Sequence, residues 1–168
     1  MAALEGYSEN TYSTLMYLTL EGMNIRSEPL DHVASHIGMA TGITAILRAV
    51  PFMASKGNVI LPVDICAEEG VRQEDVKRHG AYASSVQNAI FAIATKANDH
   101  MMTARKMITE MTPMKQAPGF PVLLESVPTS LYLERLEKVN FDVFHPSLSR
   151  REWKLPYRAY KAYAFRRI

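Results

Sequence analysis

The chain has 168 residues, about the size of one domain, and its hydrophobic fraction of 48% is enough to build a core. Its formal net charge is only +2, so the overall charge does not predict a nucleic-acid-binding protein. The single cysteine, Cys66, excludes an internal disulfide bond and is typical of a reducing compartment; because no basic neighbour or motif activates it, we expect an inert, partly buried thiol.

No uninterrupted run of 18 apolar residues occurs, so no membrane-spanning segment is predicted. Neither a secretory signal nor an arginine-rich, serine-rich transit peptide is recognisable at the start. Met1 leads almost at once into a helical pattern of the kind found in the middle of a domain. We therefore expect a fragment, a short isoform or a truncated gene model.

The first predicted helix covers residues 2–24, with Gly22 and Asn24 as stop signals. Its apolar and aromatic positions follow helical spacing, namely Leu4, Tyr7, Thr11, Leu15, Leu18 and Met23. Glu5 and Glu9 lie one turn apart, a spacing that fits a metal clamp. Two solvated glutamates in a frayed first turn are the commoner arrangement, and we favour that interpretation.

The second predicted helix begins near Leu30, after Pro29, and places Asp31 in its first turn, where a negative charge suits the helix dipole. Its apolar residues recur at three- and four-residue intervals: Val33, Ile37, Ala40, Ile43, Ile46, Leu47 and Val50. Gly38 and Gly42 each cost the helix about 1 kcal/mol. They therefore predict the close approach of a second helix.

His32 and His36 are four residues apart on this helix, a spacing that binds zinc when a third ligand and a general base accompany it. The sequence reads HVASH and lacks the HExxH pattern. We therefore favour two polar side chains on the outer face of the helix.

The middle of the chain predicts short elements and one long helix. Residues 51–58 read as a loop, VILP as a brief extended piece, and residues 64–69 and 73–78 as short helices with solvated charges, separated by Gly70. Residues 83–111 form the longest helix pattern, closed by Thr112 and Pro113. Its methionines suit an adaptable binding surface, but core packing is the commoner role of Met101, Met102, Met107, Met111 and Met114.

After the loop MKQAPGFPVLL, a helix starts near Val122, is interrupted at Pro128, resumes to Val139 and is followed by the aromatic turn NFDVFHPSL. The tail LPYRAYKAYAFRRI predicts a helix with one aromatic and one cationic face. Such a helix either contacts an anionic membrane, where each basic residue contributes about 1 kcal/mol, or packs its tyrosines on the core. Both interpretations stay open at this point.

The run IGMATGITAILRAV followed by GNVILP resembles the second signature of the squalene/phytoene synthase superfamily, roughly LGxALQLTNILRDVxED leading to GRxYLP. The resemblance implies an all-α protein, the carboxy-terminal part of a squalene/phytoene synthase-like (isoprenoid synthase) fold. In those enzymes, carboxylates at the end of this helix hold magnesium on a prenyl diphosphate. The corresponding residues here are Ala49, Phe52 and Met53, with Arg48 kept, and none of the three supplies the oxygen ligand that magnesium prefers.

Four landmarks occur in the order of one branch of the superfamily, mitochondrial complex I assembly factors with a phytoene-synthase-like domain: YSENTYSTLMYLTLEGM, DHVASHIGMATGITAILRAVPF, LPVDIC with EGVRQEDV, and VNFDVFHPSL. By this resemblance, residues 1–168 are one partial domain whose amino-terminal half is missing. It further implies a pseudoenzyme at the matrix side of the mitochondrial inner membrane, acting early in complex I assembly. No catalytic, metal-binding or cofactor-binding residue and no cofactor is expected.

The partners that the resemblance implies are early complex I intermediates or a membrane-arm subunit, not nucleic acid, with peripheral membrane association and room for a lipid or isoprenoid in the groove. Two alternatives stay open. One is a residual isoprenoid transferase or isoprenoid-binding protein, with metal ligands from Glu5 and Glu9 or from a partner chain. The other is a helical remnant without function.

Overall fold

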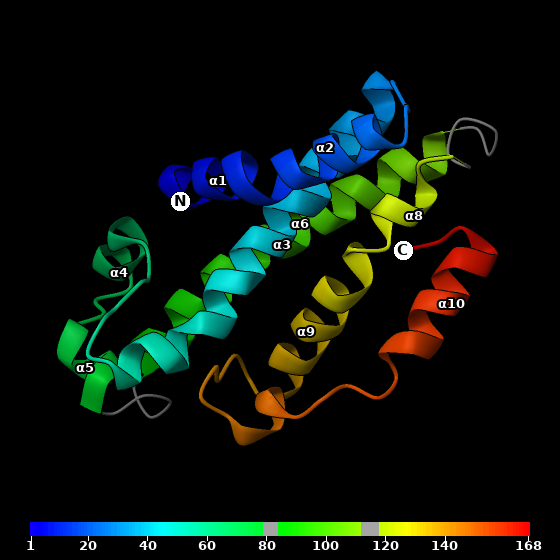
Figure 1. The fold of residues 1–168 in the computed structure, drawn as a ribbon. Coiled ribbons are helices and arrows are strands. Elements are labelled where there is room, and N and C mark those ends of the chain that lie inside the picture. The colour runs from blue at the N-terminus through cyan, green and yellow to red at the C-terminus, as the bar shows by residue number, and fades with distance from the viewer. Residues whose placement is uncertain (79–83, 112–117) are drawn as a thin grey trace.

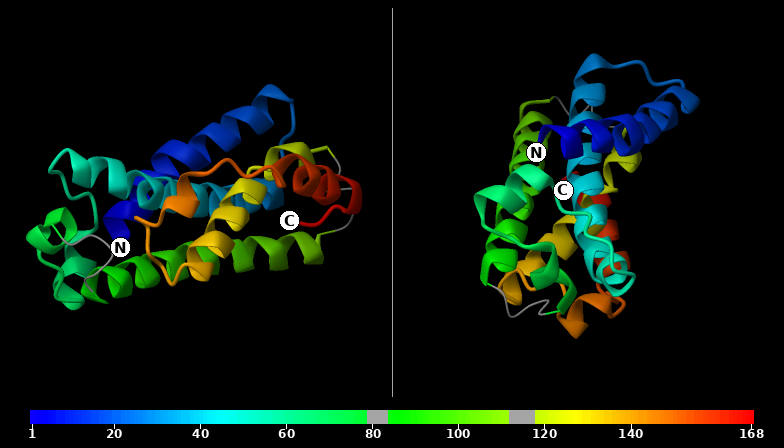
Figure 2. Two further views of the ribbon diagram at one scale, coloured as in Figure 1. Left: turned by 90° about the horizontal axis from the view of Figure 1, so that it is seen from below. Right: turned by 90° about the vertical axis from the view of Figure 1, so that its left-hand side faces the viewer.

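The computed structural model describes residues 1–78, 84–111 and 118–168 (Figure 1). Every element of regular structure in these ranges is a helix, which confirms the predicted all-α class. Two long helices, α3 (Glu28–Ser55) and α6 (Ser84–Glu110), lie side by side in opposite directions and form the centre of the bundle. Figure 2 shows the remaining helices arranged around this pair, with α4 and α5 at one end and α10 at the other.

The first helix of the bundle crosses over α3 (Figure 1). It consists of α1 (Ala2–Ser8), a π-helical turn (Glu9–Ser13) and α2 (Thr14–Gly22), which follow one another without a break. Asn24, one of the two predicted stop signals, adopts a φ of 57°, a left-handed conformation that asparagine tolerates better than most residues. The predicted helix over residues 2–24 is therefore confirmed to within two residues of its end.

The close approach predicted from the two glycines of α3 is confirmed. A Cβ atom added at Gly38 would lie 2.5 Å from the Cα atom of Ser13, and one at Gly42 would lie 2.5 Å from the hydroxyl oxygen of Ser8. Both serines are fully buried in the first helix. Glycine is therefore needed at both positions, because any side chain would push the two helices apart.

The predicted loop over residues 51–58 is wrong for its first half, because α3 continues through Pro51 to Ser55. The helix instead ends in a Schellman motif, in which Gly57 adopts a φ of 79° and the amide of Asn58 donates to the carbonyl of Met53. Gly57 is thus the stop signal. Pro51 removes one backbone hydrogen bond, which the long helix tolerates because its inner face is packed in the core.

By length and composition alone, α3 is apolar enough to cross a membrane, although no uninterrupted apolar run predicted this. Half of its most apolar stretch is buried inside the structure. Its fully buried side chains, such as Val33, Ile37 and Leu47, belong to the hydrophobic clusters that join it to its neighbours. We therefore interpret α3 as the central core helix of the bundle.

The short helices α4 (Val63–Glu68) and α5 (Gln73–Arg78) confirm the two predicted for this region, and VILP forms no strand. The helix predicted over residues 83–111 corresponds to α6, which ends at Glu110, and its apolar face is buried as expected. Met101 is buried and Met107 and Met111 pack against a core cluster, whereas Met102 is exposed, so core packing is confirmed for three of the methionines. Ala83, Thr112, Pro113 and Met114 lie outside the described residues.

The carboxy-terminal part contains α8 (Phe120–Leu123), α9 (Ser126–Lys138), a 3-10 turn (Pro146–Ser149) and α10 (Leu155–Phe165). The predicted interruption at Pro128 is wrong, because this proline lies in the first turn of α9, where its missing N–H needs no partner. The chain bends instead at residues 124–125, between α8 and α9.

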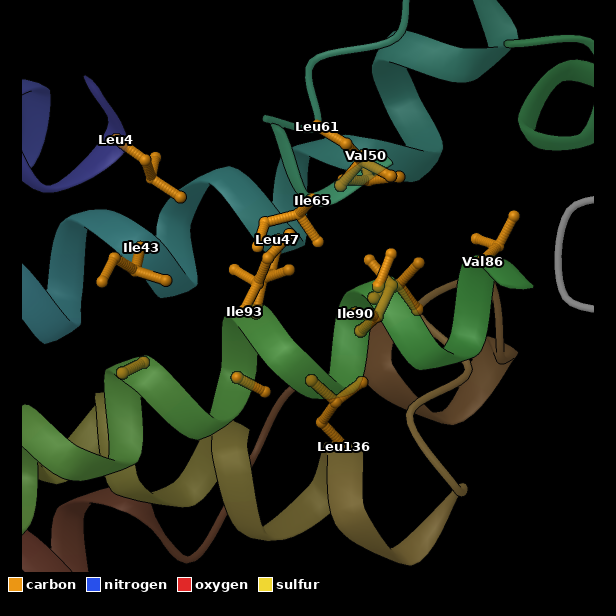
Figure 3. Packing of buried hydrophobic residues seen from close by; sticks show 14 of the residues in the cluster. Leu4, Ile43, Leu47, Val50, Leu61, Ile65, Val86, Ile90, Ile93 and Leu136 are labelled. Atoms are coloured by element: carbon orange, nitrogen blue, oxygen red, sulfur yellow. The ribbon is translucent and has the colours of Figure 1, made fainter. Parts of the chain in front are cut away.

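The larger hydrophobic cluster joins the two central helices to α9, as Figure 3 shows for Ile43 and Leu47 of α3, Ile90 and Ile93 of α6, and Leu136 of α9. A second cluster joins α2, α3, α6 and α8 around Leu20, Leu30 and Phe120. By contrast, the third cluster has only three buried members, Val127, Leu131 and Ala162, and it attaches α10 to α9. The terminal helix is therefore attached through a much smaller hydrophobic cluster than the two central helices.

Candidate functional site

Three surfaces carry residues that the sequence analysis singled out: the end of α3, the crossing of the first helix, and the tail helix. At the end of α3, Phe52 is exposed and Ala49 and Met53 are half-buried. The ammonium group of Lys56 lies 4.3 Å from the centre of the Phe52 ring, a cation–π contact. The three positions thus present a methyl group, an aromatic ring and a thioether, with no oxygen ligand for magnesium.

Arg48, the basic residue that the resemblance keeps, is exposed and lies on the α9 side of α3. Its guanidinium carbon is 6.0 Å from the centre of the Tyr132 ring. Burial raises the pKa of Tyr132 to about 12, although the charges of Arg48 and Arg135 oppose the shift. Tyr132 therefore stays protonated at any physiological pH and offers Arg48 a neutral aromatic face.

At the crossing of the first helix, Glu5 and Glu9 are both half-buried, so the prediction of two solvated glutamates is wrong. A carboxylate oxygen of Glu5 lies 3.1 Å from Nε2 of His100 and 3.6 Å from Nζ of Lys96. The two glutamates are half-buried because α3 and α6 supply polar partners to the first helix that are far away in the sequence.

Glu9 has a separate set of partners. Its two carboxylate oxygens accept hydrogen bonds of 2.6 Å from the Tyr17 hydroxyl and 2.9 Å from the Ser35 hydroxyl. Burial by itself raises the pKa of Glu9, but the hydrogen bonds, together with nearby His36, outweigh it and lower the pKa. Burial and the Glu9 carboxylate raise the pKa of Tyr17 to about 12. Glu9 is therefore ionised and Tyr17 is its protonated donor.

The prediction of outward-facing histidines is correct for His32, which is exposed, but wrong for His36, which is half-buried against α6. Nδ1 of His36 lies 3.0 Å from Nδ1 of His100. Burial lowers the pKa of His36, and the charge of a protonated His100 would lower it further. In the tautomer in which Nε2–H of His100 donates to Glu5, its Nδ1 accepts from Nδ1–H of His36. These contacts join the first helix, α3 and α6 through His100.

This polar cluster, which comprises Glu5, Glu9, Tyr17, Ser35, His36, Lys96 and His100, was missed by sequence reasoning. Its members are separated by up to 95 residues, and their only sequence signal is a position at the edge of an apolar helical stripe. Within residues 1–78, 84–111 and 118–168, no group of three or more His, Cys, Asp or Glu side chains is arranged to hold a metal ion.

A groove with a volume of about 670 Å³ lies along the contact between the tail helix α10 and α9. Its apolar wall includes Val127, Ala162 and Ile168, and its cationic side chains are Arg105, Lys154, Arg158, Lys161 and Arg167. Arg158 donates to Glu134 at 2.7 Å, and Arg105 donates to the backbone of Ile168 and the hydroxyl of Ser130. This groove therefore combines an apolar wall with a cationic rim.

The tyrosines of the tail do not pack on the core. Leu155 and Ala162 form the contact with α9, whereas Tyr157, Tyr160, Tyr163 and Phe165 are exposed, as is Trp153 just before the helix. At its carboxyl end, the guanidinium of Arg166 lies 4.4 Å from the centre of the Tyr163 ring and 5.0 Å from that of Phe120. The core-packing interpretation of the tail tyrosines is therefore wrong.

Two further cavities and Cys66 are also candidate sites. A cavity of about 280 Å³ lies between α6 and α9, and one of about 630 Å³ lies beside α2 with Glu21, Glu28 and Asp31 in its wall. None of the three cavities is lined by Ala49, Phe52 or Met53. Cys66 is half-buried as expected, and burial raises the pKa of its thiol, which keeps the reactive thiolate scarce.

Comparison with known proteins identifies relatives along nearly the whole chain. A family model described as squalene/phytoene synthase matches residues 1–156. The proteins named "NADH dehydrogenase (ubiquinone) complex I, assembly factor 6" from Rattus norvegicus and Homo sapiens are 41% identical over 157 residues and 43% identical over 153 residues. The Drosophila melanogaster homolog of that name is 35% identical over 157 residues.

These alignments cover 94%, 91% and 94% of the chain, but only 46%, 44% and 46% of the three relatives. The chain thus spans less than half the length of the curated relatives that it matches. No solved structure matches it significantly.

Proposed function

The chain belongs to the squalene/phytoene synthase family, and from this premise we propose that it is a non-catalytic assembly factor for mitochondrial respiratory complex I, NADH:ubiquinone oxidoreductase. The observation that carries the proposal is the identity of 41% and 43% to two relatives whose name is that of a complex I assembly factor, over more than nine-tenths of this chain. Because the chain spans less than half of each relative, the role is proposed for the part of the protein that it represents.

The non-catalytic part of the proposal is supported by the end of α3. Ionisation of a prenyl diphosphate depends on metal ions that neutralise the developing charge. Ala49, Phe52 and Met53, at the positions that resemble the ligand positions of the enzymes, cannot coordinate magnesium through oxygen. The residues present therefore do not fit the metal site of a prenyl transferase.

Glu5 and Glu9, the alternative ligands for a metal ion, already have partners within the protein. Glu5 contacts His100 and Lys96, and Glu9 accepts hydrogen bonds from Tyr17 and Ser35. Moving either carboxylate to a metal would leave half-buried polar groups without partners, which is costly. This arrangement supports a structural role for both glutamates and disfavours residual transferase activity.

We place the protein on the matrix side of the mitochondrial inner membrane, bound to early complex I intermediates or to a membrane-arm subunit. The name of the relatives supports a mitochondrial setting. The exposed aromatic and basic residues of α10 support peripheral contact with a membrane.

Affinity purification from mitochondria of the source organism tests the assembly role. Tagged chain should recover complex I subunits in sub-complexes smaller than the mature enzyme, and deletion of the gene should reduce assembled complex I on native gels. Leu47→Asp, which buries a charge in the core, provides a matched control that should recover none. Normal complex I in the deletion strain, with no subunit recovered by the tagged chain, would refute the proposal.

A second experiment tests the absence of catalysis. Purified chain, and the longer protein where it exists, is incubated with labelled prenyl diphosphates and magnesium, and no product is expected. Turnover that disappears in Glu5→Gln or Glu9→Gln would overturn the non-catalytic assignment and establish the isoprenoid transferase instead.

A further inference from the structure

We propose that α10, together with Trp153, docks flat on the surface of an anionic phospholipid bilayer, with its outer aromatic side chains at the level of the lipid headgroups. This inference deepens the proposed function and rests on it for the identity of the membrane. Its physical basis is the arrangement of the tail helix and of the groove between it and α9.

The attachment of α10 leaves one whole side of the helix uncovered. Leu155 and Ala162 pack against α9, and with about 100° between successive residues they lie on one side of the helix. Tyr157 and Tyr160 lie on the opposite side, where they are 67% and 71% exposed. The outer face therefore presents Tyr160 away from the body of the protein, with the exposed Tyr157 at the edge of the groove beside α9, which it helps to line.

The exposed side chains are of the type that bilayer interfaces favour. Tyrosine and tryptophan combine an apolar ring with one hydrogen-bonding group, which suits the boundary between headgroups and acyl chains. Trp153 is 79% exposed just before the helix, and Phe165 is 67% exposed at its end. The aromatic surface thus continues along the full length of α10.

The charge of this surface selects an anionic partner. From Lys154 to Arg167 the sequence has five basic residues and no acidic one. Arg158 is paired with Glu134, and Arg166 lies over two aromatic rings. Within the described part of the chain, Lys161 and Arg167 have no ion-pair partner, and both line the groove beside α10. Lys154 is exposed, with its ammonium 5.7 Å from the centre of the Trp153 ring, and lipid phosphates can reach it together with Lys161 and Arg167.

The groove favours lipid over an acidic protein as the source of the negative charge. Its cationic side chains outnumber the carboxylate of Glu134, which is paired with Arg158, so the rim matches a phosphate. Its apolar wall of Val127, Ala162 and Ile168 matches the upper part of an acyl chain. A planar bilayer also contacts the convex outer face of a helix without needing a complementary shape.

Trp153 is the only tryptophan of the chain, so its fluorescence reports directly on this surface. The purified 168-residue chain is titrated with vesicles of phosphatidylcholine alone or with about one-third phosphatidylglycerol. We expect a blue shift of Trp153 emission and co-sedimentation only with the anionic vesicles. Raising the salt concentration to about 1 M should weaken binding, because it shortens the screening length to about 3 Å.

Two sets of variants separate charge from aromatic contact. The triple variant Lys154→Gln, Lys161→Gln, Arg167→Gln should bind anionic vesicles about a hundredfold more weakly. Tyr157→Ser with Tyr160→Ser should reduce the blue shift and the binding, with the salt dependence retained. A charge-matched control, Arg26→Gln, Lys56→Gln, Lys138→Gln, alters exposed residues outside the tail and should keep most of the binding. Far-UV circular dichroism verifies that each variant is folded.

Equal binding to neutral and anionic vesicles, an unchanged Trp153 spectrum, or equal losses in the tail variant and its control would overturn the inference. If the chain ignores vesicles but its recovery of complex I subunits depends on the three basic residues, the surface contacts an acidic protein instead. Because the vesicle experiment contains no complex I, its failure leaves the assembly role standing. Conversely, if the affinity purification refutes the assembly role, binding to anionic vesicles is still expected.

Discussion

The crossing of the first helix over α3 and the docking of α10 on α9 show two different ways of attaching a helix. At the crossing, Gly38 and Gly42 let two backbones approach until a single Cβ atom would clash with Ser13 or Ser8. At α10, one buried alanine and one half-buried leucine form the apolar contact. The first attachment depends on shape and tolerates little change, whereas the second leaves most of the helix free for a partner.

The polar residues of the two regions differ in the same way. At the crossing, Glu5, Glu9 and His36 each have partners on another turn or another helix. At α10, Lys161 and Arg167 face a groove that is open to solvent. The crossing therefore uses its charges to stabilise the fold, and the tail presents its charges to the surroundings. Functional sites are drawn from regions of the second kind, where few internal contacts must be broken.

The largest expected effect on the free energy of unfolding comes from comparing one type of substitution, leucine to alanine, at the two attachments. Leu20→Ala, in the cluster under α2, should lower the free energy of unfolding by about 2–5 kcal/mol, because the side chain is 1% exposed and leaves a cavity. Leu155→Ala, in the half-buried contact of α10, should lower it by about 1 kcal/mol. Urea denaturation followed by circular dichroism measures both, and equal losses would contradict the comparison.

The next effect tests the close approach of the helices. Gly38→Ala should lower the free energy of unfolding by about 1–3 kcal/mol, because the added methyl group meets the backbone of Ser13, which cannot rotate away. The usual gain from alanine in a helix, about 1 kcal/mol, is too small to compensate. Gly6→Ala in α1 is the control: nothing lies within 4 Å of its Cβ position, so this variant should be more stable than the parent.

A third effect concerns pH. The folded protein holds the pKa of His36 below its usual 6.5 through burial and then through the charge of His100, with Glu9 opposing and His32 adding to the shift. The unfolded chain therefore binds this proton at a higher pH than the folded chain does. Stability from neutral His36 is fully present above the unfolded pKa and falls as the pH drops through it.

His36→Gln should consequently make the free energy of unfolding depend less on pH between about 8 and 5.5. Glutamine keeps a polar side chain toward His100, next to Glu5, but does not titrate. His32→Gln, an exposed histidine one turn earlier whose charge is the smallest cause of the His36 shift, is the matched control and should change the dependence much less. Urea denaturation at a series of pH values measures the free energy of unfolding. If it depends on pH with the same slope in both variants, the His36–His100 pair is excluded as the source of the pH dependence.

The smallest effect belongs to the tail. Tyr160→Ala should change the free energy of unfolding by less than about 0.5 kcal/mol, because the ring is 71% exposed and makes no core contact. The same variant should still reduce binding to anionic vesicles. A large loss of stability would show that α10 holds the bundle together and would remove the distinction between the two regions.

Sequence periodicity alone determined most of the helices. Repeats of three and four residues place α3 and α6, and charge clusters around Gly70 place α4 and α5, because these signals are local to each helix. The resemblance at the end of α3 was also readable from the sequence, through Ala49, Phe52 and Met53 next to Arg48. That these residues replace metal ligands, and that the chain is a partial domain, stay predictions.

Only the tertiary structure decided which polar and aromatic side chains are enclosed. Glu5 and His36 are half-buried because His100, 95 and 64 residues away, lies between them, and a local pattern contains no information about such distant partners. In the same way, Pro51 and Pro128 are tolerated because of their positions in packed helices. The tail tyrosines face outward because Leu155 and Ala162 match the surface of α9. A helix pattern defines which residues share a face, but the neighbouring helices determine which face is covered.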